Sequence, residues 1–418
     1  MALYRTSVLK QFKLKEKPKK LDLSKKILQV NKLILIGNGF DLALGLKTKY
    51  EDFLLWLLKK YIVQALESGE QNAPFDKYPG MYNEIYRKRD FRKVYGYSEN
   101  NLFDVLFNTS YRLDKNEILQ KENLKDLNDL LGKFKIEIAI HNKNGLFEEI
   151  LKDSNLRWVD VEGSYFKIMK EVINRSRKFP DNYIDVLNSD LEKIKGYLRE
   201  YLKELDYSIS EDLNVATKYY SQFIQGIKRA ELTEVAKKSE VIKTENLLFL
   251  NFNYTNSLSN VINKSRSEFY FNGNINIKEW RIHGSLTGEI NSMVFGYGDE
   301  MDSDYKKIEE LNDNRFFRGI KSFKYSENSK YRDLLRFLYS EDYQVCVYGH
   351  SCGLSDRLML NEIFEHENCK SIKIFYYDKT EFVNKTMDIS RHFKNNQIMR
   401  QRIVEFNEED QIPQVKNS

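Results

Sequence analysis

The residues of this sequence best suited to chemistry lie in four short motifs, each directly after an apolar run. They are Gly37-Asn38-Gly39-Phe40-Asp41, Asn253-Tyr254-Thr255-Asn256, His283-Gly284-Ser285 and Gly349-His350-Ser351. Histidine can accept or donate a proton near neutral pH, and an asparagine amide can orient a water or a sugar hydroxyl. Closely spaced glycines let an anion approach backbone N–H groups. Together these residue types are compatible with a site for a phosphorylated small molecule.

The apolar runs before the motifs predict short buried strands, because they are short, rich in β-branched residues and bounded by turn residues. The predicted strands are Lys32–Ile36, Leu247–Phe252, Trp280–His283, Gln344–Gly349 and Ser371–Tyr377. Helical patterns between several of them indicate an α/β fold with a mostly parallel, Rossmann-like sheet. Ligands of such sheets bind beyond the C-terminal strand ends. We therefore expect the four motifs to share one pocket.

Each motif also has a purely structural explanation. The Gly37–Gly39 segment can be a tight turn that needs positive φ, and it is not the Rossmann fingerprint because the next glycine is Gly45. Asp41 can cap a local turn, Asn253 can close its strand through an Asx turn, and His283 can be a hydrogen-bonded structural histidine. In the acidic stretch Trp158–Glu162, the first turn of a helix explains Asp160 and Glu162 more simply than a place in the cleft.

The pattern along the chain predicts five segments. Residues 1–30 form a lysine-rich, partly disordered leader, in which Leu21–Val30 can add a helix or an edge strand. Residues 31–50 hold the first strand and the glycine loop, and a capping box at Thr48–Glu51 starts a helix. Residues 51–240 form a large helical insertion, with amphipathic stretches at 117–135, 161–176 and 184–205. Residues 241–405 complete the α/β domain, and 406–418 form a loose polar tail.

Composition excludes several classes of protein. With 67 Lys and Arg against 62 Asp and Glu, the net charge is only +5, so we do not expect nucleic acid as a dedicated partner. The three cysteines form no C-x-x-C pair, which argues against disulfides and zinc. No apolar run reaches the roughly 18 residues of a membrane span, and no secretory signal pattern is present, so we expect a cytoplasmic protein. The acidic run Asp299, Glu300, Asp302 and Asp304 is typical of a solvated loop, and we expect no metal.

Several motifs, in this order, resemble the bacteriophage abortive infection AbiH family. KLILIGNGFDLALGLKTKYEDF is similar to the opening of that family, and WVDVE, FNYTNSL, IHGSL, VFGYGDE and VYGHSCGLSD are similar to its later blocks. The resemblance runs from about residue 32 to 377. It implies a role in phage defence.

The AbiH family in turn resembles the sirtuin-like domains of antiphage systems, whose conserved blocks match Gly37–Gly39, Asn253-Tyr254, His283-Gly284 and Ser355-Asp356. In those domains the asparagine and the histidine serve NAD⁺ hydrolysis, so the resemblance implies that Asn253 and His283 are catalytic. The implied NAD⁺-binding residues are Gly37, Asn38, Gly39, Phe40, Asp41, Gly349, His350, Ser351 and Asp356. Thr255 stands where the sirtuin-like block has aspartate, and the zinc-binding cysteines of true sirtuins are missing, which argues against deacetylation.

Three hypotheses follow for the function. The preferred one is a sirtuin-like NAD⁺ glycohydrolase that stops infected cells. The alternatives are a sensor that binds a dinucleotide without cleaving it, and a toxin that acts on nucleic acid through the basic leader. Because an unregulated NADase would kill its host, the first hypothesis also implies a phage trigger or a switch between oligomeric states.

Overall fold

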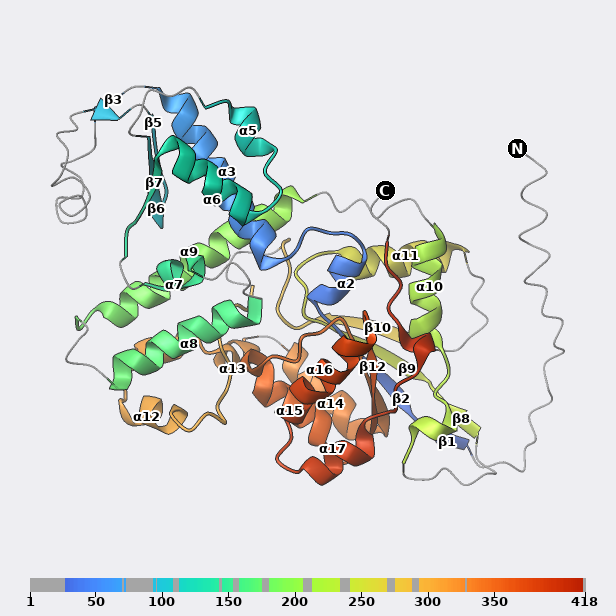
Figure 1. Cartoon of the computed structure of the whole chain (residues 1–418). Coiled ribbons are helices and arrows are strands. Elements are labelled where there is room, and N and C mark those ends of the chain that lie inside the picture. Colours follow the sequence, from blue (N-terminus) through green and yellow to red (C-terminus); the bar gives the residue numbers. More distant parts are fainter. Residues whose placement is uncertain are drawn as a thin grey trace, which may run out of the picture.

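A five-stranded parallel sheet forms the centre of the computed structural model (Figure 1). Its strands are β2 (Asn31–Ile36), β9 (Asn246–Asn251), β10 (Asn276–Arg281), β11 (Tyr343–Tyr348) and β12 (Cys369–Phe375), in the spatial order β10-β9-β2-β11-β12. Numbered along the chain this order is 3-2-1-4-5, that of the first five strands of the Rossmann fold. The predicted α/β class and parallel sheet are confirmed.

The structure describes residues 27–69, 71–72, 93–94, 96–107, 113–142, 145–152, 158–174, 180–205, 213–233, 241–268, 275–287, 293–327 and 329–415. Short elements besides those discussed below are β3 (Gln71–Asn72), β4 (Lys93–Val94), η2 (Arg229–Glu231), α12 (Tyr305–Glu310) and η4 (Asn314–Phe317).

Both faces of the central sheet are buried because alternate residues of each strand enter two different cores. In β2, Leu33 and Leu35 belong to one core, and Ile34 and Ile36 belong to the other. The first core is completed by α14 (Lys330–Ser340), α15 (Arg357–Glu365), α16 (Lys379–Ser390) and α17 (Asn396–Arg402), and the second by α10 (Leu213–Ile224) and α11 (Ser257–Glu268). The result is a three-layer sandwich of helices, sheet and helices.

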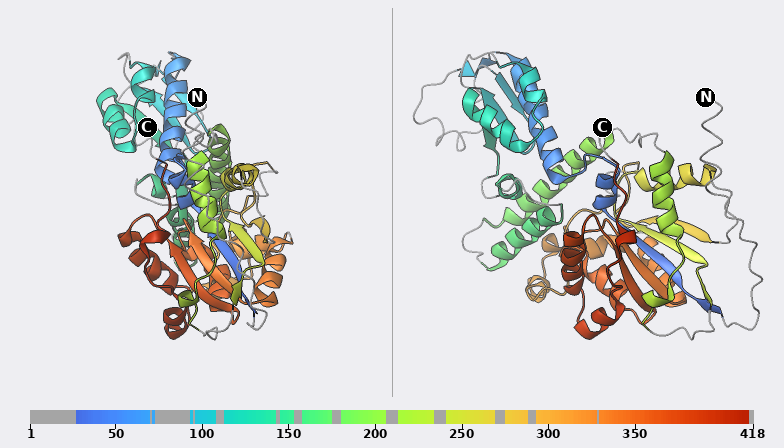
Figure 2. Two further views of the ribbon diagram at one scale, coloured as in Figure 1. Left: turned by 90° about the vertical axis from the view of Figure 1, so that its right-hand side faces the viewer. Right: turned by 45° about the vertical axis from the view of Figure 1, so that its right-hand side comes forward.

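Most of the segment between β2 and β9 builds a second lobe to one side of the sheet (Figures 1 and 2). The core of this lobe also takes in apolar residues from beyond β10, such as Leu286, Phe295 and Ile320. Its helices are α3 (Tyr50–Ser68), α5 (Lys115–Leu119), α6 (Leu124–Phe134), α7 (Leu146–Leu151), α8 (Trp158–Asn174) and α9 (Tyr183–Glu204). The lobe also holds an antiparallel sheet of β5 (Gly96–Glu99), β6 (Phe103–Phe107) and β7 (Ile136–Ile140), so the segment is not helical throughout. Moreover, α10 packs on the central sheet rather than in this lobe.

Two helix boundaries differ from the sequence prediction. Helix α3 begins at Tyr50, and the Asp52 carboxylate accepts a hydrogen bond from the Lys49 N–H at 3.0 Å, so the capping residues lie one position later than predicted. The stretch 117–135 is interrupted between α5 and α6, because Asn123 caps a new helix by accepting from the Asp126 N–H.

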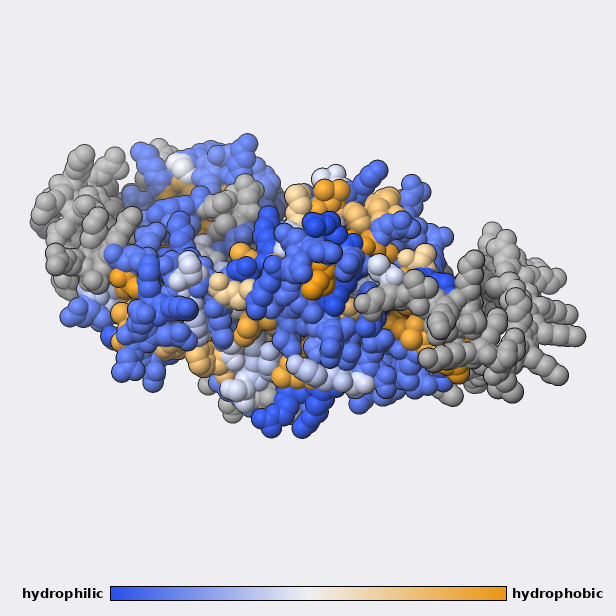
Figure 3. All heavy atoms as spheres, turned by 90° about the horizontal axis from the view of Figure 1, so that it is seen from below, coloured by the Kyte–Doolittle hydropathy of each residue, from blue (hydrophilic) through white to orange (hydrophobic). Residues whose placement is uncertain are grey.

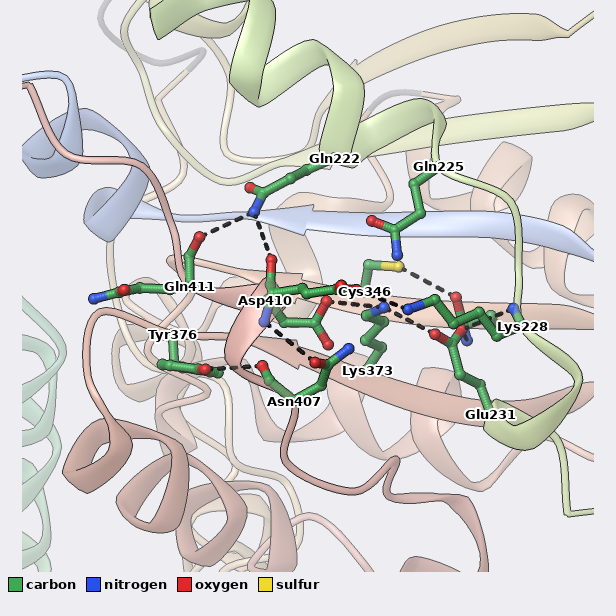
Figure 4. Close-up of polar contacts among 12 residues, drawn as sticks. Gln222, Gln225, Lys228, Glu231, Cys346, Lys373, Tyr376, Asn407, Asp410 and Gln411 are labelled. Atoms are coloured by element: carbon green, nitrogen blue, oxygen red, sulfur yellow. Dashed lines mark hydrogen bonds and ion pairs between the residues drawn. The ribbon is translucent and has the colours of Figure 1, made fainter. Parts of the chain in front are cut away.

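Both described ends of the chain are tied to the fold. Strand β1 (Ile27–Gln29) pairs in parallel with β8 (Val241–Lys243), as an edge strand rather than a helix, while residues 1–26 lie outside the described residues. The C-terminal prediction of a loose tail is wrong for residues 407–415, because Ile412 is buried and Tyr376 bridges to Gln411. Beside η6 (Glu408–Asp410), the Tyr376 hydroxyl donates to a carbonyl of this segment (Figure 4).

The outer surface is mainly hydrophilic in the view from below, with apolar residues scattered over it in small groups (Figure 3). In the described part of the chain, every helix is too short or too polar to cross a membrane.

Candidate functional site

A cavity of about 570 Å³ opens beyond the C-terminal ends of the central strands. Every predicted site residue except Phe40 lines it: Gly37, Asn38, Gly39, Asp41, Asn253, His283, Gly349, His350, Ser351 and Asp356. The strand order reverses at β2, between β9 and β11, which is the place where open α/β sheets bind their ligands. The volume lies within the range of small-molecule sites. Residues of α3, α8 and α9 cover the cavity from the helical lobe.

Phe40 is the exception among the predicted residues. Its ring is fully buried and packs edge-on against Tyr219 and Tyr348, with Phe223 beside them. The residue lies on α2 (Asn38–Ala43), where Phe40 and Ala43 belong to the core on one face of the sheet. Phe40 is therefore a core residue, and its side chain takes no part in the cavity.

Gly37 and Gly39, in the loop after β2, have no room for a side chain because the loop after β11 lies against them. A Cβ on Gly37 would lie 2.5 Å from the His350 Cα, and one on Gly39 would lie 2.8 Å from the Gly349 Cα. Gly37 has an extended backbone with φ of −127°, and Gly39 is helical, whereas Gly349 has a φ of +70°. The tight-turn explanation is thus wrong for the first loop. Its glycines allow the loops after β2 and β11 to touch.

The same contact uses most backbone donors of the first loop. The Gly39 N–H donates to the Gly349 carbonyl at 2.8 Å, and the Gly37 N–H donates to the Tyr348 carbonyl at 3.3 Å. The Phe40 N–H donates to the Gly37 carbonyl at 2.9 Å. The loop therefore offers an anion fewer N–H groups than the sequence pattern predicts.

His283 and Asp356 form a buried pair at the cavity wall. The His283 Nε2 lies 3.0 Å from the Asp356 Oδ1, which also accepts from the Tyr325 hydroxyl at 3.2 Å. Burial opposes the charge on Asp356, but Lys321 and His283 beside it hold its pKa well below the usual range. An ionised carboxylate only accepts hydrogen bonds, so Nε2 carries the His283 proton. Nδ1, without a hydrogen bond to any described residue, is left as an acceptor.

A lysine that the sequence analysis did not identify completes this network. Lys321, on α13 (Lys321–Tyr325), lies 3.1 Å from the Asp356 Oδ1 and 2.9 Å from the Glu162 Oε2. Burial alone would lower the pKa of Lys321, but Asp356 and Glu162 raise it above the ordinary value. Glu162 lies on α8, faces the cavity and also accepts from the Gly296 N–H at 3.2 Å. Its position in the cavity corrects the simpler explanation as a helix-terminal acid.

Asn253 holds the glycine loop in place. Its Nδ2 donates to the Gly37 carbonyl at 3.0 Å, and its Oδ1 has no partner among the residues that the structure describes. The Asx turn at this strand end belongs to Asn251, whose Oδ1 accepts from the Asn253 N–H at 2.9 Å. Asn253 thus has a structural role through its donors and a free acceptor for a ligand or a water.

Asp41 is a buried carboxylate fixed by two hydroxyl groups. Thr255 donates to its Oδ2 at 2.7 Å, and Ser257 donates to its Oδ1. Burial raises the pKa of Asp41 to about 6, while hydrogen bonds from Ser257 and Thr255 oppose the rise. Asp41 can therefore change its charge close to neutral pH.

His350 and Ser351 belong to the loop after β11. The His350 Nδ1 accepts from the Cys352 N–H at 3.0 Å, and burial lowers the pKa of His350 to about 3, so this ring stays neutral. The Ser351 carbonyl accepts from the Lys385 Nζ at 2.9 Å, which ties α16 to the loop.

Comparison with known families agrees with the order of the motifs. Residues 33–378 match the family described as Bacteriophage abortive infection AbiH. The chain belongs to the AbiH family. Its role is accordingly in bacteriophage abortive infection. No curated protein matches this AbiH chain. The matched region includes all four strand-end motifs, as well as Glu162, Lys321 and Asp356.

Three carboxylates of the acidic run form ion pairs with lysine or arginine side chains. Asp299 pairs with Arg357 at 3.2 Å, Asp302 with Lys170 at 3.0 Å and Asp304 with Lys307 at 2.7 Å. Among the described residues, no three potential ligands converge in the arrangement that a metal ion needs.

Proposed function

We propose that this AbiH protein stops phage infection by hydrolysing the nicotinamide–ribose bond of NAD⁺. The observation that supports this proposal best is the buried His283–Asp356 pair, which lines a cavity at the switch point of a Rossmann-type sheet and leaves the imidazole Nδ1 as an acceptor. A histidine oriented by a carboxylate is a common arrangement for a general base.

In the proposed reaction, a water molecule attacks the C1′ atom of the ribose. The His283 Nδ1 takes a proton from this water as the new C–O bond forms. The C1′–N bond breaks, and nicotinamide leaves as a neutral molecule with the bonding electron pair. The transition state carries oxocarbenium character, so the ionised Asp41 would stabilise positive charge nearby. Asp356 stabilises the imidazolium, and the Asn253 Oδ1 orients the water or a ribose hydroxyl.

The occupied donors of the glycine loop bear on how any dinucleotide would be held in the cavity. Because the Gly37 and Gly39 N–H groups already donate to the Tyr348 and Gly349 carbonyls, the cavity holds a pyrophosphate less firmly than a Rossmann fingerprint does. A sensor that binds a nucleotide without cleaving it uses the same cavity. A toxin acting on nucleic acid would instead lose binding steeply with added salt.

Purified protein incubated with NAD⁺, with and without phage lysate, tests the proposal by chromatography of nicotinamide and ADP-ribose. His283→Ala should lower turnover by about 10²–10³-fold, the usual cost of losing one well-placed polar group. His366→Gln is the matched control, because His366 lies outside the cavity. Calorimetric binding of NAD⁺ without turnover by the native protein would instead identify the sensor.

The same proposal has a cellular test. In bacteria that express the protein, NAD⁺ should fall after phage infection and before lysis, and the His283→Ala strain should keep its NAD⁺ and lose protection together. An uninfected culture is the control, since many toxins lower NAD⁺ only as cells lyse. Protection with steady NAD⁺ would reject the glycohydrolase and leave the family assignment intact.

A further inference from the structure

One buried cation, Lys321, is shared between carboxylates of the two lobes. It is only 1% exposed and pairs with Glu162 of the helical lobe and with Asp356 of the α/β domain. Both carboxylates are themselves less than 10% exposed. Charges so poorly solvated interact strongly, because little water screens them.

The shared atom of this network is the Asp356 Oδ1. Lys321 Nζ lies 3.1 Å from it, and His283 Nε2 lies 3.0 Å from it. The Lys321 ammonium and the His283 imidazole therefore compete for the same negative charge. A lysine in this position leaves Asp356 able to orient the imidazole but reduces its attraction for a second proton on that ring.

We propose that Lys321 is a positioning residue that sets how readily His283 takes up a proton, and that Glu162 of α8 moderates the effect of Lys321. The catalytic consequence rests on the proposed function, in which His283 is the base. The charge coupling itself does not depend on any substrate.

Few groups around His283 can change charge near neutral pH. Several ionisable side chains line the cavity with it or bond to Asp356. Those on α8, α13, η5 (Leu354–Asp356) and the loops after β9 and β11 are Glu162, Lys321, Tyr325, Asp356, Tyr254 and His350, and the rest of the wall adds Asp41, Lys49, Glu51, Glu381, Lys385 and Asp388. Burial raises the pKa of Tyr254 and Tyr325 well above the ordinary value and lowers that of His350 to about 3, so all three stay neutral. Apart from Asp41, which lines the same cavity and whose pKa burial raises to about 6, the charges that govern His283 are thus those of the three-membered network.

Two variants move the His283 titration in opposite directions. Glu162→Gln removes a negative charge from beside Lys321, so the cation acts more strongly and the midpoint of the His283 titration should fall. The double variant Glu162→Gln/Lys321→Met removes the cation without leaving Glu162 buried and unpaired, so the midpoint should rise. Damage to the fold does not predict opposite shifts. Lys324→Met is the control, because Lys324 lies on the same helix, pairs with Glu192 at 3.8 Å and does not line the cavity.

The measurement is a pH titration of the full chain labelled with ¹³C at histidine Cε1, with the His283 signal assigned by His283→Gln. We expect the two midpoints to lie on either side of the native value, each displaced by about one pH unit, or tenfold in the protonation equilibrium, and Lys324→Met to match the native protein. Shifts of the same sign, or no shift in either variant, would overturn the coupling.

The pH profile of kcat/KM for NAD⁺ separates this inference from the proposed function. If His283 is the base, the acidic limb moves with the titration midpoint in each variant. Opposite shifts in the titration without any NAD⁺ turnover would support the coupling and reject the glycohydrolase. Turnover whose acidic limb stays fixed in both variants would reject the positioning role.

Discussion

Asp41 and His350 line the same cavity, yet burial displaces their proton equilibria in opposite directions. The pKa of Asp41 is raised to about 6, and that of His350 is lowered to about 3. In both cases the buried side chain resists the charge that it would carry in water. Each residue therefore links folding to pH, with opposite sign.

For Asp41 the stability contribution is complete below pH ~4 and is lost as the pH rises through about 6, because the folded state then holds a proton that the unfolded state has released. Asp41→Asn removes this dependence. From pH 4.5 to pH 7, the free energy of unfolding of the native protein should fall by about 2 kcal/mol relative to the variant. Urea unfolding at the two pH values measures the difference, and parallel behaviour of the two proteins would contradict the raised pKa.

For His350 the stability contribution is present above pH ~6.5 and is lost as the pH falls toward about 3, because the unfolded chain takes up a proton that the folded state refuses. His350→Asn keeps an acceptor for the Cys352 N–H but does not titrate. From pH 7 to pH 5 the native protein should lose about 2 kcal/mol relative to this variant. Denaturant titrations of both proteins test the difference between their slopes, because the variant keeps the pH dependence that comes from Asp41 and loses only that of His350.

At the scale of elements, two helical glycines differ in the space available for a side chain. A Cβ on Gly39 of α2 would meet the Gly349 backbone at 2.8 Å, while a Cβ on Gly163 of α8 would meet nothing within 4 Å. Gly39→Ala should therefore destabilise the protein by roughly 1–3 kcal/mol, as overpacking does. Gly163→Ala should stabilise it by about 0.5–1 kcal/mol, since alanine is the better helix former. Thermal unfolding of both variants measures these two effects. Equal changes in melting temperature would refute the loop contact.

The central strands could be predicted because their signal is local. Lys32–Ile36 is short, apolar and followed by a glycine, and it agrees with β2 to within one residue. Parallel pairing then explains why motifs far apart in sequence meet at one edge. The sequence does not predict the strand Phe103–Phe107, because this strand lies among helix formers. Its partner strands, β5 and β7, are specified only by the fold of the lobe.

The polar network of the cavity could not be predicted in the same way. Lys321 and Glu162 are 159 residues apart, and although Glu162 ends the WVDVE block, no pattern in the sequence indicates that it pairs with Lys321. Their contact depends on how the helical lobe packs on the α/β domain, which local pattern does not determine. The roles of Asn253, His283 and the other site residues remain predictions.

At the scale of the whole molecule, the C-terminal segment binds together elements that are distant in sequence. The Asp410 carboxylate lies 3.0 Å from the Lys373 Nζ of β12, and the same lysine pairs with Glu231 at 2.9 Å (Figure 4). Farther along, the Val415 N–H donates to the Ala43 carbonyl at the end of α2, the helix that carries Asp41. The segment thus connects the edge of the sheet to the wall of the cavity.

A chain that ends at Phe406 should be less stable, because Lys373 then loses one of its two buried carboxylate partners. Because Lys373 keeps Glu231 as a partner, losing the Asp410 contact should cost about 1.5–3 kcal/mol, the usual contribution of a hydrogen bond to a charged group. Urea unfolding of this truncated chain should show the loss, and Asp410→Asn in the full chain should show part of it without removing the backbone contacts. A chain that ends at Val415 is the control, since it keeps Asp410, the Ile412 contact and the Val415 hydrogen bond. Equal unfolding midpoints for the chains ending at Phe406 and Val415 would show that the segment contributes nothing to the fold.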